Sequence, residues 1–450
     1  MRLKINNPFL KNVSFLASGS VLAQAITILV SPIIMRIYDP TSFGIFSVFL
    51  SSVTIFAALS TGQYENAIML QSGKDRILSA SIITVLLSAG ISTFFGISVW
   101  LINPLLMEKI QFLKVPGSGA ILGLAVFLTS MITVMNLLNN KMLAYQRIAA
   151  GKTIQATTVS STSIVYGMLS ASFIGLQVGL LAGRLINVLF LVKPHFVALA
   201  ESLGTLKYDQ FRAHIKRYRK FPLFTSWAIV FNTISAQIPI FTFEYFYTSS
   251  EVGLYALAQR IIIGPVLLLS GSVGQVFFQE GAAVKDDPVR LMSISSDISD
   301  TISKYSAIPF AIIVLFGEII FKTLFGDAWS SAGIFAQYLA IPTYFVMSTN
   351  PLLSIFSILE KQKSILAFNA ILLIARAIVV IAMSLLGFPV LQIITVYAFV
   401  SGLLWLSLNL YIFRLLGSSV LQRLIVNVKW ISASLIILKL IETILSVVIS

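Results

Sequence analysis

Long apolar segments separated by short polar ones dominate the pattern of this chain. A helix that crosses a membrane needs about 20 mostly apolar residues, and twelve segments meet that criterion. They cover residues 13–35, 43–63, 77–102, 119–138, 153–173, 178–199, 222–246, 252–278, 305–325, 331–358, 364–387 and 389–413. The pattern predicts an all-α polytopic membrane protein with about twelve transmembrane helices.

One more apolar run, residues 431–450, follows the twelfth segment and contains Lys439 and Glu442. Its length suits a thirteenth span, but two charges within it are also typical of a helix that lies at the membrane surface. We therefore expect an extra C-terminal hydrophobic helix that is either interfacial or spanning.

Composition and charge agree with a membrane protein. The chain is 57% hydrophobic and 11% charged, whereas soluble domains carry about 25% charged residues. The net charge of +14 would suggest a nucleic-acid partner in a soluble protein. With the N-terminus in the cytoplasm, 23 of the 31 Lys and Arg residues fall in inner segments and four in outer ones. This follows the positive-inside rule, so we expect a cytoplasmic N-terminus and no nucleic-acid partner.

The most basic segment is the stretch 200–221, whose second half carries six Lys or Arg residues. Tyr208, Phe211, Ile215 and Tyr218 recur there at the spacing of one helix face. A basic amphipathic helix of this kind suits the anionic lipids of a cytoplasmic leaflet. A plain topology anchor would account for the same charges.

A short motif occurs twice in the chain. The first copy, YDPTSFGIFS, begins at Tyr38, and the second, YTSSEVGLYA, begins at Tyr247, 209 residues later. In both copies a glycine, Gly44 or Gly253, follows the tyrosine by six positions and is flanked by bulky apolar residues. The offset is almost half of the chain, each half holds six predicted spans, and duplicated bundles are a common transporter plan. The predicted parts are a six-helix lobe, a basic linker, a second six-helix lobe and a tail: 1–199, 200–221, 222–416 and 417–450.

The sequence lacks the common motifs of catalysis and cofactor binding. The sequence has no cysteine, two histidines, no GxxxxGK[ST] phosphate loop, no GxSxG and no HExxH. We therefore expect no catalytic residue, metal site or cofactor, and a transporter rather than an enzyme. A membrane polysaccharide polymerase would need a large outer loop with catalytic Arg or His, and the longest outer loop, 103–118, is short.

Charged residues within the apolar segments are the candidates for function. An ionisable residue at the bilayer centre costs about 2.5–3.5 kcal/mol and usually has a function. We rank Arg260 first, Arg376 second and Arg184 third as substrate-binding residues, because a guanidinium stays charged and binds two phosphate oxygens at once. For each, the alternative is an internal ion pair or a hydrogen bond to backbone. Glu244 and Glu65 are the candidates for ion coupling.

The residues around both copies of the motif resemble one known family. The stretch YDPTSFGIFS, which follows SFLASGSVLAQAI, resembles the start of the Wzx-type oligosaccharide flippases. The run GLYALAQR, from Gly253 to Arg260, resembles the same family at its eighth helix. These flippases belong to the polysaccharide transporter branch of the MOP superfamily, a superfamily that also contains the MATE drug exporters and the lipid II flippase.

The resemblance implies a V-shaped pair of six-helix bundles that works by alternating access. It implies that the cargo is an undecaprenyl-pyrophosphate-linked oligosaccharide for O-antigen, in lipopolysaccharide biosynthesis, or for another surface polysaccharide. The cargo would cross the bacterial inner membrane, with a polysaccharide polymerase and a chain-length regulator as pathway partners. Family members have a cationic central cavity, and Arg260, Arg376 and Arg184 match it by position. A MATE-like multidrug or cation antiporter is the alternative, although acids are scarce in these spans.

Overall fold

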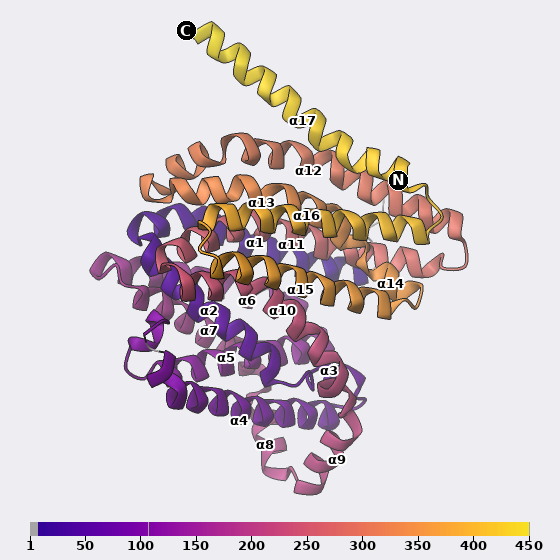
Figure 1. Ribbon diagram of the computed structural model, residues 1–450. Helices are drawn as coiled ribbons and strands as arrows, with labels where there is room; N and C mark the ends of the chain where they lie inside the picture. The colour runs from indigo at the N-terminus through magenta and orange to yellow at the C-terminus, as the bar shows by residue number, and fades with distance from the viewer. Residues whose placement is uncertain (1–7, 107, 450) are drawn as a thin grey trace. The chain divides into compact units, whose positions relative to one another are not determined.

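The structure is a computed structural model that describes residues 8–106 and 108–449, and within them it contains helices and no strand (Figure 1). The basic segment 1–7, which we predict to be cytoplasmic, lies outside the described residues. The longer helices are α1 (Pro8–Ile37), α2 (Pro40–Ser60), α4 (Lys74–Leu106), α5 (Ser118–Lys141), α6 (Tyr145–Leu169), α7 (Phe173–Val192), α10 (Ser226–Phe246), α11 (Ser249–Ala283), α12 (Pro288–Phe325), α13 (Ser330–Thr349), α15 (Gln362–Leu385), α16 (Val390–Leu415) and α17 (Val420–Ile449). The shorter ones are α3 (Asn66–Leu70), η1 (Gln111–Lys114), η2 (Lys193–His195), α8 (Phe196–Thr205), α9 (Tyr208–Tyr218), η3 (Phe221–Thr225), η4 (Asp327–Trp329), η5 (Asn350–Ser354) and α14 (Ile355–Ile358).

Each of the twelve predicted spans coincides with a helix. Among the described residues, eleven helices are long and apolar enough to cross a membrane. They are α17 and ten of the predicted spans. The two remaining predictions, α6 and α10, form helices of 25 and 21 residues. The all-α polytopic fold with about twelve transmembrane helices is therefore confirmed.

Both copies of the repeated motif begin a helix in the same way. A polar side chain before α2, and another before α11, accepts a hydrogen bond from the backbone N–H three residues on, which stabilises the first turn. These bonds run from Ser42 N to Asp39 Oδ1 at 3.1 Å and from Glu251 N to Thr248 Oγ1 at 3.4 Å. In both copies the tyrosine before the cap donates its N–H to the carbonyl four residues back at 2.9 Å. Equivalent atoms are 209 residues apart, as the sequence repeat predicts.

The glycines of the two motif copies lie against each other's helices. A Cβ on Gly44 would stand 1.7 Å from the carbonyl oxygen of Ser249, and a Cβ on Gly253 would stand 1.9 Å from that of Pro40. Pro40 and Ser249 are also 209 residues apart, so the two contacts are equivalent under the sequence repeat. Backbones approach this closely only where the crossing residues lack side chains.

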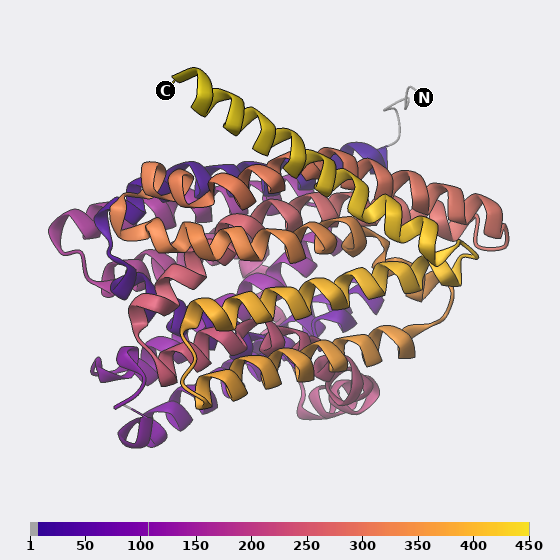
Figure 2. The same ribbon diagram turned by 45° about the horizontal axis from the view of Figure 1, so that its top comes forward.

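The packing of the later helices also repeats. The chain divides into two compact units, residues 1–253 and 254–450. In the first unit α4 packs on α5, α5 on α7 and α6 on α7. In the second α12 packs on α13, α13 on α16 and α15 on α16, which are the orange to yellow helices of Figure 2. These are equivalent pairs in the two predicted six-helix bundles. The first compact unit extends beyond the predicted linker because α10 packs on α2.

Paired glycines mark the tightest point of one repeated helix pair. In α4 and α5, a Cβ on Gly119 would stand 2.5 Å from the carbonyl oxygen of Gly96. In α12 and α13, a Cβ on Gly333 would stand 2.4 Å from that of Gly317. Close helix contact through small residues is the usual packing within membranes, and here both bundles use it at corresponding places.

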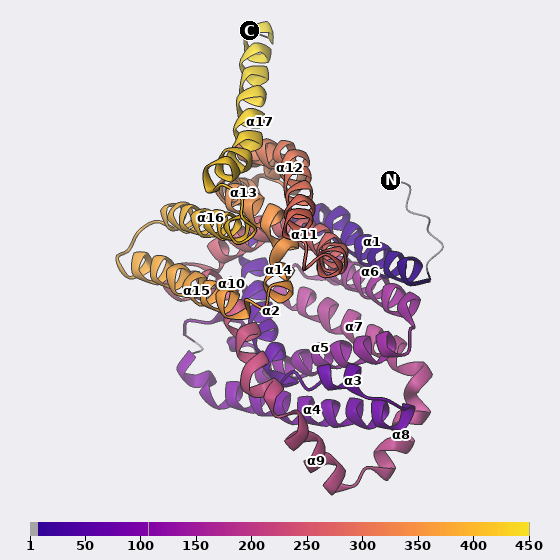
Figure 3. The ribbon, with the colours of Figure 1, turned by 90° about the vertical axis from the view of Figure 1, so that its right-hand side faces the viewer.

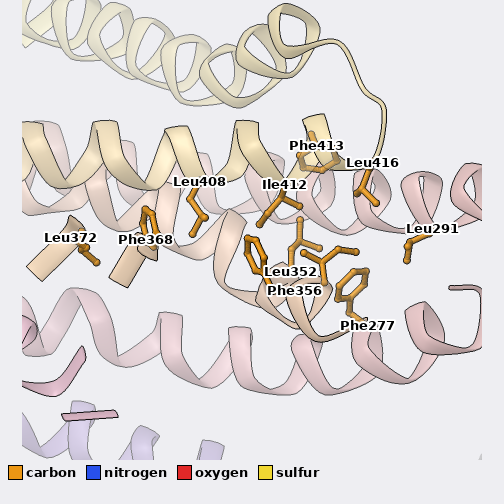
Figure 4. Close-up of a cluster of buried hydrophobic side chains, with 11 residues drawn as sticks. Phe277, Leu291, Leu352, Phe356, Phe368, Leu372, Leu408, Ile412, Phe413 and Leu416 are labelled. Carbon is orange, nitrogen blue, oxygen red and sulfur yellow. The ribbon is translucent and has the colours of Figure 1, made fainter. Parts of the chain in front are cut away.

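An apolar cluster joins the helix ends in the second unit (Figure 4). It includes Phe277 of α11, Phe356 of α14 and Phe413 of α16, each at most 1% exposed. The cluster surrounds the short segment η5–α14, which connects α13 to α15. Its side chains hold this irregular connection against four longer helices, α11, α12, α15 and α16.

The C-terminal helix α17 buries polar residues and exposes apolar ones. Arg423, Asn427 and Ile431, spaced by four, form its buried face, while Ile425 and Ile436 are 57% and 61% exposed. Its first half packs on α12 and its second half extends away from that helix (Figures 1 and 3). A helix on the membrane surface would turn its polar residues to water, so this arrangement favours our thirteenth-span alternative, with the apolar face toward lipid.

Candidate functional site

Arg376 lies at the centre of an aromatic and polar cluster in the second unit. Its Nε donates to Ser401 Oγ on α16 at 3.1 Å, and its guanidinium carbon lies 5.2 Å from the ring centroid of Tyr397. Tyr255, fully buried on α11, lies next to Tyr397 and within electrostatic reach of Arg376. All these neighbours are neutral, and no ion pair to Arg376 occurs in residues 8–106 and 108–449. The positive charge therefore has no acidic partner in the described chain.

Arg260 lies on the same helix as Tyr255 but on another side of it. Five residues separate the two, a rise of about 7.5 Å and a rotation of about 140° along an α-helix. The Arg260 side chain is exposed, and it too forms no ion pair within the part of the chain that the structure describes. The cluster around Arg376 therefore includes Tyr255 of α11 but not Arg260.

Arg184 has a different environment. It is 8% exposed, and its Nη1 donates to the backbone carbonyl of Ala125 at 3.3 Å. This bond joins α7 to α5 inside the first unit. The geometry agrees with the alternative of backbone hydrogen bonding, in which Arg184 stabilises the bundle.

Glu244 forms hydrogen bonds at the start of α11. It is 5% exposed, and it accepts bonds from the backbone N–H of Gln111 at 3.2 Å and from Ser249 Oγ at 2.9 and 3.1 Å. Both carboxylate oxygens therefore have partners within the first unit. Positioning of the η1 segment and of the first turn of α11 accounts for this residue without a bound ion.

Glu65 is the less satisfied of the two candidate acids. It is 4% exposed and follows the end of α2, outside the predicted spans. Burial raises the pKa of its carboxyl group, and a hydrogen bond with Thr61 partly opposes that shift. Its Oε2 atom is buried and has no hydrogen-bond partner among the described residues. Glu65 therefore remains a candidate for taking up a proton.

The basic linker helix α9 contacts protein through much of its predicted apolar face. Tyr218 accepts a hydrogen bond from Gln71 Nε2 at 2.8 Å, and Ile215 packs on the cluster that contains Tyr64. The His214 ring lies between Tyr64 and Tyr218, with centroid distances of 6.3 and 4.9 Å. Tyr208, by contrast, is 75% exposed. The docking of α9 onto the first bundle leaves mainly its basic residues for an anionic surface.

A buried polar network in the second unit was missed by sequence reasoning. Arg423 on α17, which the predicted topology places in a cytoplasmic segment, is 4% exposed and forms an ion pair with Asp300 of α12. It also contacts Asn409 of α16, which accepts a bond from Asn427 at 2.7 Å, and Tyr344 of α13 donates to the Asn427 carbonyl at 3.1 Å. The i,i+4 spacing of Arg423 and Asn427 was the available signal. The network joins α17 to three helices of the bundle.

Comparison with known proteins identifies the family of this chain. Residues 33–334 match the family model "Polysaccharide biosynthesis protein". No curated protein sequence matches the chain.

Solved structures share the fold. A lipid II flippase MurJ in an inward closed conformation superposes with a TM-score of 0.70 at 13% identity, covering 95% of this chain and 92% of that one. An inward-facing multidrug resistance MATE family transporter of the MOP superfamily gives 0.51 at 16% identity, covering 90% and 96%. MATE in complex with MaL6 gives 0.55 at 13% identity, covering 91% and 97%. The chain thus belongs to the polysaccharide biosynthesis protein family and has the fold of MOP-superfamily transporters.

Proposed function

We propose that this protein is a flippase that moves undecaprenyl-pyrophosphate-linked oligosaccharide units, for O-antigen or another surface polysaccharide, across the bacterial inner membrane by alternating access. Family membership supports polysaccharide biosynthesis as the process, and the fold is shared with a protein described as a lipid II flippase. In this proposal the N-terminus is cytoplasmic, and a polymerase and a chain-length regulator act on the product.

The observation that carries the proposal is the pair of arginines in α11 and α15 without acidic partners. Arg376 is surrounded by Ser401 and Tyr397, and Arg260 is exposed. Two positive charges on membrane-spanning helices are costly unless an anion or water compensates them. A pyrophosphate beside Arg376 supplies that anion, and the guanidinium in turn lowers the cost of moving the phosphate charge through a low-dielectric region. Tyrosine and serine beside Arg376 are groups that suit sugar hydroxyls.

Arg184 is omitted from this headgroup set because its guanidinium donates to backbone within the first bundle. Glu65 is the acid that we propose for proton coupling, since one of its oxygens has no partner in the described chain. Glu244 is proposed to position the start of α11.

Substitution of Arg376 tests the proposal. Charge-assisted hydrogen bonds contribute about 1.5–3 kcal/mol, so Arg376→Ala should lower flipping about 10- to 100-fold. Arg376→Lys keeps the charge but not the two-pronged geometry, so its flipping rate should lie between those of the wild type and Arg376→Ala. The matched control is Arg414→Ala, because Arg414 is an exposed arginine at the end of α16. Cells lacking the wild-type gene and carrying each variant would be assayed for surface polysaccharide and for lipid-linked oligosaccharide on each leaflet.

Two results would contradict the proposal. Full polysaccharide export by Arg376→Ala, with normal protein level, would remove the arginine from the mechanism. Loss of drug resistance with unchanged surface polysaccharide would instead favour the MATE-like antiporter, which the shared fold permits. Accumulation of the lipid-linked unit on the inner leaflet is the outcome expected for a flippase.

A further inference from the structure

A small cavity opens between α12 and α17 in the second unit, apart from Arg260 and Arg376. It has a volume of about 350 Å³ and is lined by Asp300, Thr301, Lys304, Tyr305, Val426, Lys429 and Trp430. Lys304 and Tyr305 are adjacent on α12, and Lys429 and Trp430 are adjacent on α17. Each helix thus contributes a lysine followed by an aromatic residue.

The two lysines converge on one indole ring. Lys304 Nζ lies 5.5 Å from the ring centroid of Trp430, and Lys429 Nζ lies 5.1 Å from it. The two nitrogens are therefore no more than about 11 Å apart. Lys304 Nζ also lies 5.6 Å from the ring of Tyr305. Aromatic faces stabilise a cation only modestly, so an anion in the cavity would gain an attraction to both lysines.

The acid in the cavity does not neutralise the lysines. Asp300 forms an ion pair with Arg423 of the buried network described above. The ion pairs of the described chain are this one and Lys322–Asp327, and neither includes Lys304 or Lys429. The cavity therefore carries a net positive charge from two exposed lysines.

The position of the cavity along the helices indicates what kind of anion it meets. Lys304 directly precedes the predicted span 305–325, and Lys429 lies two residues before the apolar run 431–450. In the predicted topology both lie at the cytoplasmic boundary of the membrane. Tyr and Trp gather at that depth, and basic pockets between membrane helices on this side bind anionic headgroups.

Exposed apolar residues continue from the cavity toward the membrane interior. Ile308, one turn after Lys304 on α12, is 55% exposed, and Ile436 and Ile437 of α17 are 61% and 56% exposed. A ligand with a phosphate at the lysines and hydrocarbon chains along these residues would satisfy both surfaces. A free inorganic phosphate would use the lysines alone.

We infer that the α12–α17 cavity is a binding site for a phosphate group, carried by an anionic membrane lipid, with Lys304 and Lys429 as its cationic ligands and Trp430 as its wall. A lipid held there bridges the C-terminal helix to the bundle on the cytoplasmic side. The site is separate from the proposed cargo-binding arginines and does not depend on what the protein transports.

The test measures binding of phosphatidylglycerol to the purified full-length protein in detergent, from the rise in unfolding temperature with lipid concentration. One lysine near an anionic surface changes lipid affinity about fivefold. Removing both charges, in the double variant Lys304→Gln with Lys429→Gln, should therefore weaken the apparent affinity for the lipid about 30-fold. Lys304→Arg with Lys429→Arg should keep it. The matched control, Lys361→Gln with Lys363→Gln, removes two exposed lysines on the same predicted side and should change it less than twofold.

Two further ligands distinguish a lipid phosphate from a free phosphate ion. Phosphatidylcholine, which carries no net charge, and inorganic phosphate at equal concentration should both give small shifts. An equal shift from inorganic phosphate that disappears in the Lys304/Lys429 variant would assign the cavity to a free anion and overturn the lipid assignment. If the Lys361/Lys363 control lost as much lipid affinity as the test variant, binding would follow overall surface charge, and the proposed site would be wrong. The unfolding temperature without lipid shows whether each variant is folded.

Discussion

Replacement of Gly44 by alanine places a methyl group where α2 crosses the start of α11. The added Cβ would stand 1.7 Å from the carbonyl oxygen of Ser249, whereas even a close carbon–oxygen contact is about 3.3 Å. The helices must therefore separate by up to about 1.6 Å, or their backbones must distort. Overpacking usually costs about 1–3 kcal/mol, and we expect Gly44→Ala to lie near the upper end because the obstacle is backbone.

The reciprocal contacts of Gly44 and Gly253 predict how two such changes combine. Gly253→Ala should cost about as much as Gly44→Ala, because its Cβ would stand 1.9 Å from the carbonyl oxygen of Pro40. One separation of the helices relieves both overlaps. The double variant should therefore lose less stability than the sum of the single losses, by about 1 kcal/mol or more.

Unfolding of the purified variants in detergent would measure these losses. Gly271→Ala is the control on the same helix, since a Cβ there would have no heavy atom within 4 Å. Alanine exceeds glycine in helix propensity by up to about 1 kcal/mol, so this control should be neutral or stabilising. Wild-type stability of Gly44→Ala, or strictly additive losses in the double variant, would refute the reciprocal contact between the two motif copies.

Three other predictions concern the buried polar groups. Arg423→Met should destabilise the protein by about 2 kcal/mol, which is less than the 3–5 kcal/mol for breaking a fully buried pair because Asp300 is 43% exposed. Arg414→Met is the control. Equal unfolding temperatures of Arg423→Met and Arg414→Met would contradict the role of the network. Burial, aided by Arg217, lowers the pKa of His214 below its ordinary 6.5, so the docking of α9 should be fully stable above pH 6.5 and weaken as the pH falls below it. Hydrogen exchange of residues 208–218 would show this, and His214→Phe should abolish the pH dependence. Burial raises the pKa of Glu65 above its ordinary 4.5, so the folded chain binds the proton more tightly and should lose stability as the pH rises past 4.5; Glu65→Gln should remove that slope in unfolding temperature, and an unchanged slope would show that Glu65 is not its source.

The helices and the duplication were predictable from sequence. The apolar segments correspond to helices because a chain in a membrane must satisfy its backbone hydrogen bonds within each segment. The two motif copies share a tyrosine, a glycine and bulky apolar neighbours at one spacing, and their equal cap bonds and reciprocal glycine contacts agree with a repeat.

The environments of the charged residues were less predictable. Arg184 and Arg376 both lie in apolar segments, yet one donates to a backbone carbonyl and the other lies among serine and tyrosine side chains. Arg423, by contrast, precedes the last predicted apolar run and is buried. Depth along a helix says little about which neighbouring helix supplies a partner.

The sequence of this protein thus determined where the helices lie, the side on which the basic segments are expected and the existence of two related halves. The helices and their sides depend on composition within a segment of about 20 residues, which requires no knowledge of its neighbours. The two halves follow from a motif that the chain repeats after 209 residues. Only the tertiary structure decided that Gly44 meets the α11 backbone, that Arg423 meets Asp300 and that Lys304 and Lys429 share one tryptophan. Such contacts join residues far apart in the chain, and they form only when helix rotation and packing have brought the faces together.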